Sequence, residues 1–203
     1  MAHSFLDRFR TRAVPAQPLL SNGPAQVRAY WEALRQGSAL PSRATLDPRG
    51  FAGVLDRVFL ADRIGKGLVQ VTVAGSALCE FAGTDLRGLP LSCLFDPGSR
   101  PVLAEALEQV LAGPSVAEID LGSDRERQGL GVARLLLLPL GADGDRQQVL
   151  GAMGLAEGLR PCKLQVLGRR MEELSLPHTE PAQVPGPAPV GRGSHLRLVA
   201  VNA

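Results

Sequence analysis

The sequence predicts an α+β fold: a five-stranded antiparallel sheet with helices on one face, preceded by an amphipathic N-terminal helix.

 

Three observations support this prediction. Val69, Val71 and Val73 alternate with polar residues at the period of a half-buried strand, directly after another apolar run and a glycine turn. Segments with helical spacing and capping residues follow, and three further apolar stretches come last. The order of two strands, helices and three strands is typical of an antiparallel α+β sheet.

The first predicted element is an amphipathic helix over residues 24–36. Asn22 can cap its N-terminus, Pro24 suits its first turn, and Gly37 can end it. Its apolar positions follow the helical spacing and are Val27, Tyr30, Trp31 and Leu34. We expect this stripe to pack on the domain or on a second subunit, and its four residues are the predicted dimer or partner interface.

A short helix over residues 48–56 is predicted next, because Asp47 can cap it and a proline occupies its first turn. Strands over residues 58–64 and 68–74 then form a hairpin. Arg43 lies near the capping Asp47, so this pair either fixes the entry segment or presents a guanidinium to an anionic ligand.

The second half of the domain begins with a brief helix that Gly83 ends, followed by a longer helix between Ser99 and Gly113. Three further strands are predicted over residues 115–122, 129–140 and 148–157. Arg169 and Arg170 are interpreted as part of a solvated helix face. These elements give a domain over residues 22–176.

Both ends of the chain are predicted to lie outside this domain. Residues 1–21 lack a continuous apolar segment and are expected to form a flexible arm. Residues 177–203 begin with a stretch rich in proline and glycine, which predicts an extended tail. Residues 196–201 can form a short terminal strand that adds to a sheet edge.

Composition restricts the class of function. The formal net charge of +2 gives little attraction to nucleic acid. The three cysteines are odd in number and lack CxxC spacing, which argues against a disulfide framework or a zinc site. No apolar run is long enough to span a membrane. We therefore expect a cytoplasmic protein with no transmembrane segment and no nucleic-acid partner.

Residues suited to catalysis are sparse. The histidines fall in the predicted terminal segments and are His3, His178 and His195. This placement weakens haem ligation, metal sites and imidazole-based catalysis, each of which needs a positioned ring. The remaining acid/base candidates, Asp120, Asp124 and Glu126, lie near a solvated strand connection, where carboxylates keep similar environments. We expect no enzymatic activity and no metal.

Two segments carry a resemblance to a known family. FLADRIGKGLVQVTVAGSALCEFAGTDLRGLPLSCLF resembles the first half of PAS domains. With the upstream YWEALRQGSALPSRATLDP, the chain is similar to a bacterial branch of PAS-like proteins that contain little besides this domain. The matching positions are Trp31, Leu34, Arg35, Leu40, Pro41, Arg43, Asp47 and Pro48, then residues 74–78, 81–83 and 86–88. The resemblance covers about residues 26–157 and rests mainly on structural glycines and caps.

This resemblance implies a sensory or regulatory module that binds a small molecule, a protein partner in a signalling pathway, or both. It also implies self-association through the N-terminal helix, so we expect a homodimer. The sequence contains no visible output domain, which suggests a stand-alone regulator. A ligand cavity is expected between the sheet and residues 76–112, lined by Val71, Val73, Leu78, Phe81, Leu94, Phe95 and Leu107. Alternatively, these side chains fill the core, and the protein is a ligand-free adaptor that dimerises.

The identity of any cofactor stays open. PAS photoreceptors that bind flavin carry a reactive cysteine in the motif Gly-x-Asn-Cys-Arg-Phe-Leu-Gln, which residues 88–95 do not reproduce. Cys93 lacks the asparagine and arginine neighbours of that motif, so neither flavin-thiol photochemistry nor haem binding is expected. Cys79 and Cys93 are interpreted as small buried hydrophobic residues.

Overall fold

The computed structural model describes residues 22–35, 40–113, 115–123 and 131–174. The helices are α1 (Gly23–Leu34), η2 (Arg43–Thr45), η3 (Pro48–Arg57), α2 (Ser76–Ala82), η4 (Leu91–Leu94) and α3 (Arg100–Ala112), where η marks a 3-10 helix. The strands are β1 (Val58–Gly65), β2 (Leu68–Ala74), β3 (Ser115–Ser123), β4 (Ala133–Pro139), β5 (Gln148–Leu155) and β6 (Leu164–Glu173). The predicted arm, tail and terminal strand at residues 196–201 lie outside the described residues.

All of these strands form one antiparallel sheet in the order β2-β1-β5-β4-β3-β6. The predicted α+β class and antiparallel sheet are therefore confirmed. The sheet has six strands rather than five, because β6 returns to pair with β3 along its whole length. Arg169 and Arg170 lie in β6, so their interpretation as a helix face is wrong.

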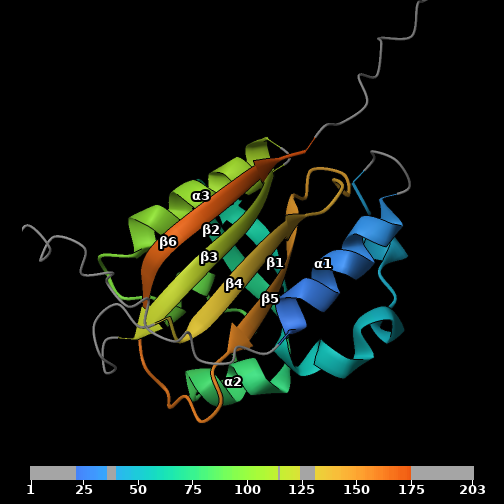
Figure 1. Ribbon diagram of the computed structural model, residues 1–203. Helices are drawn as coiled ribbons and strands as arrows, with labels where there is room; N and C mark the ends of the chain where they lie inside the picture. The colour runs from blue at the N-terminus through green and yellow to red at the C-terminus, as the bar shows by residue number, and fades with distance from the viewer. Residues whose placement is uncertain (1–21, 36–39, 114, 124–130, 175–203) are drawn as a thin grey trace, which may run out of the picture.

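Helices cover the two faces of the sheet to different extents (Figure 1). On one face, α2, η4 and α3 pack on the larger hydrophobic core, as the sequence predicts. On the other face, α1 and η3 pack on a second core formed with β4 and β5. The predicted N-terminal helix is therefore a covering element of the sheet, with Val27 and Trp31 buried against it.

A β-bulge changes the face on which one predicted core residue lies. Leu60 of β1 pairs with Val73, whereas the next residue, Ala61, pairs with Val71, so Thr72 is the extra residue of β2. An extra residue reverses the alternation of side chains between the two faces. Val71 is consequently buried in the larger core, while Val73 is 44% exposed.

Glu108 of α3 joins that helix to the β1–β2 hairpin. Both of its carboxylate oxygens accept hydrogen bonds from Arg63 Nη2, at 2.9 and 2.8 Å. The same carboxylate accepts from the backbone N–H of Gly67 in the hairpin turn. Arg63 also donates to the side chain of Gln147. These contacts fix the turn end of the hairpin against α3.

Replacing Glu108 with alanine is expected to lower the free energy of unfolding by about 1–2 kcal/mol, because a half-buried guanidinium and a turn amide lose their acceptor. Denaturant unfolding followed by circular dichroism measures the change. Glu105→Ala is the matched control on the same helix, because Glu105 forms its ion pair with Arg169 in a largely exposed position. Equal losses in the two variants would contradict a specific role for the Glu108 contacts.

Candidate functional site

The residues predicted to line a cavity do not all lie on one side of the sheet. Six of them are at most 5% exposed in the larger core, namely Val71, Leu78, Phe81, Leu94, Phe95 and Leu107. Side chains that line an internal cavity and side chains that fill a core are both buried in this way. The role of these six residues in ligand binding therefore stays a prediction. Val73 is a correction, because the bulge at Thr72 turns it to the opposite face.

On that opposite face, Val73 lines a pocket between η3 and the sheet edge formed by β1 and β2. The pocket has a volume of about 580 Å³. Its walls come from η2, η3, β1, the end of β2, the start of α2 and β5, and are Arg43, Leu46, Pro48, Phe51, Leu55, Asp56, Val58, Phe59, Leu60, Val73, Ala74, Gly75, Ser76 and Leu150. This volume falls within the range of about 300–1,000 Å³ that is usual for small-molecule sites.

The surface of this pocket is mainly apolar, and part of it is open. Leu55 and Val73 are 43% and 44% exposed, and both line the pocket. Large apolar side chains that stay exposed beside a concave surface mark a place where a ligand or partner can bury them. We therefore take this pocket as the candidate functional site.

Three polar side chains stand among the apolar ones: Arg43, Asp56 and Ser76. Asp56 lies 3.6 Å from Nε of Arg57, measured from its Oδ2 atom. Arg43 is exposed, and among the described residues no hydrogen bond or ion pair engages its guanidinium. The pocket thus contains a cation that is available to an anionic group.

Arg43 and Asp47, predicted as a pair, have separate environments. The Asp47 side chain caps η3 by accepting a hydrogen bond of 2.9 Å from the backbone N–H of Arg49. No interaction between Arg43 and Asp47 occurs within the described part of the chain. The cap predicted for Asp47 is confirmed, while the anion-binding role of Arg43 stays a prediction that its place in the pocket favours.

Tyr30 connects the wall of the pocket to α1. Its hydroxyl accepts a hydrogen bond of 2.8 Å from the backbone N–H of Asp47. Its ring meets the ring of Phe51, a pocket residue, edge to face with 5.1 Å between centroids. The ring also lies directly on Gly50, where an added Cβ would be 1.9 Å from Cε2 of Tyr30. A displacement of η3 would therefore displace Tyr30 and, with it, α1.

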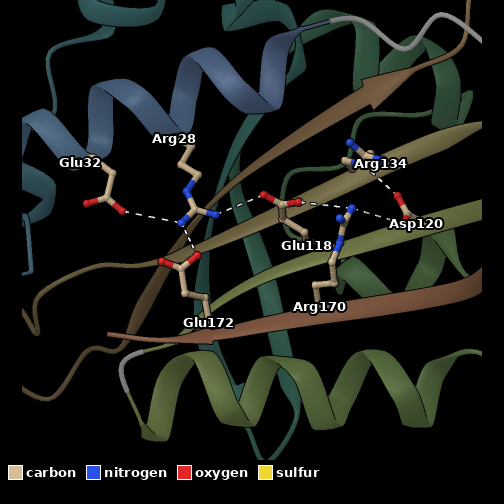
Figure 2. Close-up of polar contacts among 7 residues, drawn as sticks. All are labelled: Arg28, Glu32, Glu118, Asp120, Arg134, Arg170 and Glu172. Carbon is tan, nitrogen blue, oxygen red and sulfur yellow. Dashed lines mark hydrogen bonds and ion pairs between the residues drawn. The ribbon is translucent and has the colours of Figure 1, made fainter. Parts of the chain in front are cut away.

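A network of ion pairs ties the other side of α1 to the uncovered part of the same sheet face (Figure 2). Arg28 reaches Glu118 of β3 at 3.2 Å and also pairs with Glu172 of β6 and with Glu32 of α1. The hydrogen bond to Glu172 raises the pKa of Arg28 above its ordinary value, although burial acts in the opposite direction. The guanidinium therefore stays charged and holds α1 to both strands.

The network continues along the sheet away from α1. Arg170 lies 3.7 Å from both Glu118 and Asp120, and Arg134 donates a hydrogen bond of 2.8 Å to Asp120. Asp120 is thus paired with two arginines in a strand, which is a different environment from the solvated connection predicted for it. Asp124 and Glu126 lie outside the described residues.

The predicted partner interface on α1 needs correction for two of its residues. Val27 and Trp31 have no exposed surface, because they pack on the second core of their own domain. They cannot contact a second subunit in this conformation. Tyr30 and Leu34 are partly exposed, so their interface role stays a prediction. Val27 and Trp31 follow the other predicted alternative, in which the stripe packs on its own domain.

The sequence did not single out the pocket or the ion-pair network. The Arg28–Glu32 spacing of i, i+4 and the alternation of Glu118 and Asp120 with apolar residues are signals of an exposed polar face. Neither signal identifies the partner strand. Leu55 lies within the helix predicted over residues 48–56, but its exposure depends on how that helix meets the sheet.

The cysteines lie near the larger core, and each is partly buried. Burial raises the pKa of the Cys93 thiol, while the charges of Lys163 and Arg100 act in the opposite direction. A thiol with a raised pKa in the folded state stabilises the fold below its unfolded pKa, and this contribution is lost as the pH rises through the folded value. The neutral form of Cys93 is therefore favoured in the fold.

Cys93 is expected to react with iodoacetamide more slowly than free glutathione at about pH 8, because the thiolate is the reactive form. Peptide mass spectrometry after timed alkylation separates Cys93 from Cys79 and Cys162. In denaturant, its rate should approach that of the free thiol. A folded-state rate equal to or above that of glutathione would contradict the raised pKa.

The described residues carry neither a metal-ligand cluster nor a membrane-spanning helix. Over residues 22–35, 40–113, 115–123 and 131–174, no group of three or more His, Cys, Asp or Glu side chains is placed to hold a metal ion. No helix in the described segments has the length and apolar character needed to cross a bilayer.

Comparison with known families agrees with the architecture. A family model described as "PAS domain" matches residues 21–154, which is more than half of the chain. Neither the curated proteins nor the solved structures gave a match. The matched segment runs from α1 through nearly all of β5, and β6 completes the sheet beyond it. Given this match and the antiparallel sheet with its covering helices, the chain belongs to the PAS domain family.

Proposed function

We propose that this protein is a regulatory module that recognises a small molecule in the pocket between η3 and the β1–β2 edge and does so without transforming it. Membership of the PAS family supports a sensory or signalling role in general. The observation that carries the proposal is the contact between the pocket and α1. Phe51 belongs to the pocket wall and also meets the ring of Tyr30.

The proposed mechanism is a population shift. A ligand that prefers one position of η3 favours the position of α1 that is compatible with it, since Tyr30 contacts three neighbouring positions of the 47–51 segment. Arg28 and its carboxylate partners hold the other side of α1 to β3 and β6. Ligand binding at the pocket is thus coupled to the contacts that hold α1 on the sheet.

A protein partner would read the outward side of α1. Ala25, Ala29 and Glu32 are exposed there, whereas Val27 and Trp31 face the sheet. This outward side replaces the buried stripe as the proposed surface for a signalling partner or for a second copy in a homodimer. A cytoplasmic location and the absence of a nucleic-acid partner stay predictions.

The alternative function is a ligand-free adaptor. Burial of the six core residues on the α3 side is what a filled core requires. The exposed Leu55 and Val73 would then contact a protein instead of a small molecule. This alternative expects no bound compound and a stable dimer or complex.

Native mass spectrometry of protein purified without denaturation tests the two functions, because it reports bound small molecules and subunit number together. Ligand recognition predicts an added mass that is lost in Val73→Asp and kept in Leu167→Asp. Leu167 is a suitable control because it is 42% exposed on β6, away from the pocket. A dimer without added mass that Val73→Asp weakens and Leu167→Asp leaves unchanged would favour the adaptor.

A further inference from the structure

We infer that the pocket beside η3 binds an amphiphile with a hydrocarbon body and a carboxylate head, and that Arg43 binds the head. This inference rests on the proposed function, because it names the class of ligand for the same pocket. It follows from the distribution of apolar and charged groups around the cavity, which is set by the bulge in β2 and by the position of η2.

The apolar part of the pocket fits a hydrocarbon body. All lining residues other than Arg43, Asp56 and Ser76 have apolar side chains or, at Gly75, none. Leu55 and Val73 leave much of their surface exposed in the absence of an occupant. Covering this surface with a hydrocarbon chain removes apolar area from water on both partners, which is the main driving force for binding at such a site.

The charges favour an anionic head over a cationic one. Arg43 lines the pocket with no partner for its guanidinium among the described residues. Asp56 is the acidic group in the lining, and Arg57 stands 3.6 Å from it. The acidic group of the lining therefore has a basic neighbour, while the basic group, Arg43, has none of opposite charge in the described segments. An ammonium head would compete with Arg57 for Asp56, whereas a carboxylate would meet a free cation.

A carboxylate also matches the geometry of Arg43. The planar guanidinium can donate two parallel hydrogen bonds to the two oxygens of a carboxylate. An alcohol of the same chain length has one oxygen and no charge, so it keeps the hydrocarbon contacts and loses the paired ones. Comparing the two compounds therefore separates the head from the body.

Isothermal titration calorimetry with decanoate and decanol is the test. Decanoate is expected to bind the 203-residue chain about three- to tenfold more tightly than decanol, a range typical of an ion pair at a partly exposed site. Arg43→Gln should remove this preference. Arg49→Gln is the matched control, because Arg49 is an exposed arginine of η3 that does not line the pocket. Val73→Asp should weaken both compounds, and Leu167→Asp neither.

The outcomes separate the ligand class from the proposed function. Equal binding of decanoate and decanol, or an unchanged preference in Arg43→Gln, overturns the carboxylate head and leaves ligand recognition intact. Failure of both compounds to bind overturns the amphiphile. The emission of Trp31, the one tryptophan of the chain, reports on α1. Decanoate that binds through Arg43 without changing this emission supports the ligand class and contradicts transmission to α1.

Discussion

Replacement of Trp31 by alanine is expected to lower the free energy of unfolding by about 3–5 kcal/mol, the usual loss for a large buried aromatic side chain. The Trp31 side chain has no exposed surface and packs between α1 and the sheet. Its Nε1 donates a hydrogen bond of 3.0 Å to the carbonyl oxygen of Pro139. Arg35 lies over the ring, 5.2 Å from its centroid. Urea unfolding followed by circular dichroism measures the loss.

Trp31→Phe separates the hydrogen bond from the packing. It keeps an aromatic ring in the second core but leaves the Pro139 carbonyl without its donor, so a smaller loss of about 1–3 kcal/mol is expected. A loss below about 1 kcal/mol in Trp31→Ala would mean that α1 contributes little to the folded state. That result would contradict the proposal that α1 transmits the signal from its position on the sheet.

The helices and central strands were predictable because their signals are local. The hairpin of β1 and β2 follows from an apolar run, a glycine turn and the valine alternation after it, and α3 follows from its apolar stripe between Ser99 and Gly113. The surface on which an apolar stripe packs is not encoded in such local signals. The α1 stripe has the same spacing whether it contacts its own sheet or a second subunit, so burial of Val27 and Trp31 required the tertiary structure.

The pocket could not be predicted because it depends on a bulge. The alternation of Val69, Val71 and Val73 is regular in sequence, and it predicts one face for all three residues. The extra residue, Thr72, is visible only in the pairing with β1, where Leu60 and Ala61 are consecutive. A one-residue shift transfers every later side chain to the other face. Val73 therefore leaves the predicted cavity and enters the pocket on the opposite side.

The strand β6 was not predicted, and the reason is again an extra residue. Leu167 is an extra residue in β6, since Asp120 pairs with Gly168 and the next residue of β3 pairs with Val166. This irregularity interrupts the period-two pattern on which strand prediction relies. Long-range contacts hold β6 instead: the hydroxyl of Ser99 accepts a hydrogen bond of 2.9 Å from the backbone N–H of Val166.

Gly75→Ala is expected to lower the free energy of unfolding by about 2–3 kcal/mol, because the added methyl group overpacks a contact between two backbone segments. An added Cβ would lie 2.2 Å from the carbonyl oxygen of Asp56 and 2.5 Å from that of Leu55. These atoms belong to the end of η3 and cannot rotate away as a side chain would. The backbone of Gly75 has φ −68° and ψ 154°, which alanine adopts readily, so the loss is steric.

Gly168→Ala is the matched control for this substitution. Apart from its two chain neighbours, no residue has a heavy atom within 4 Å of an added Cβ at Gly168, and an effect within about 0.5 kcal/mol is expected. Denaturant unfolding of both variants measures the difference. Because Leu55, Asp56 and Gly75 all line the pocket, moving η3 to accept the methyl group must also alter the pocket wall. Gly75→Ala should therefore weaken decanoate binding as well as stability, and loss of neither would show that η3 is not held against β2 as described.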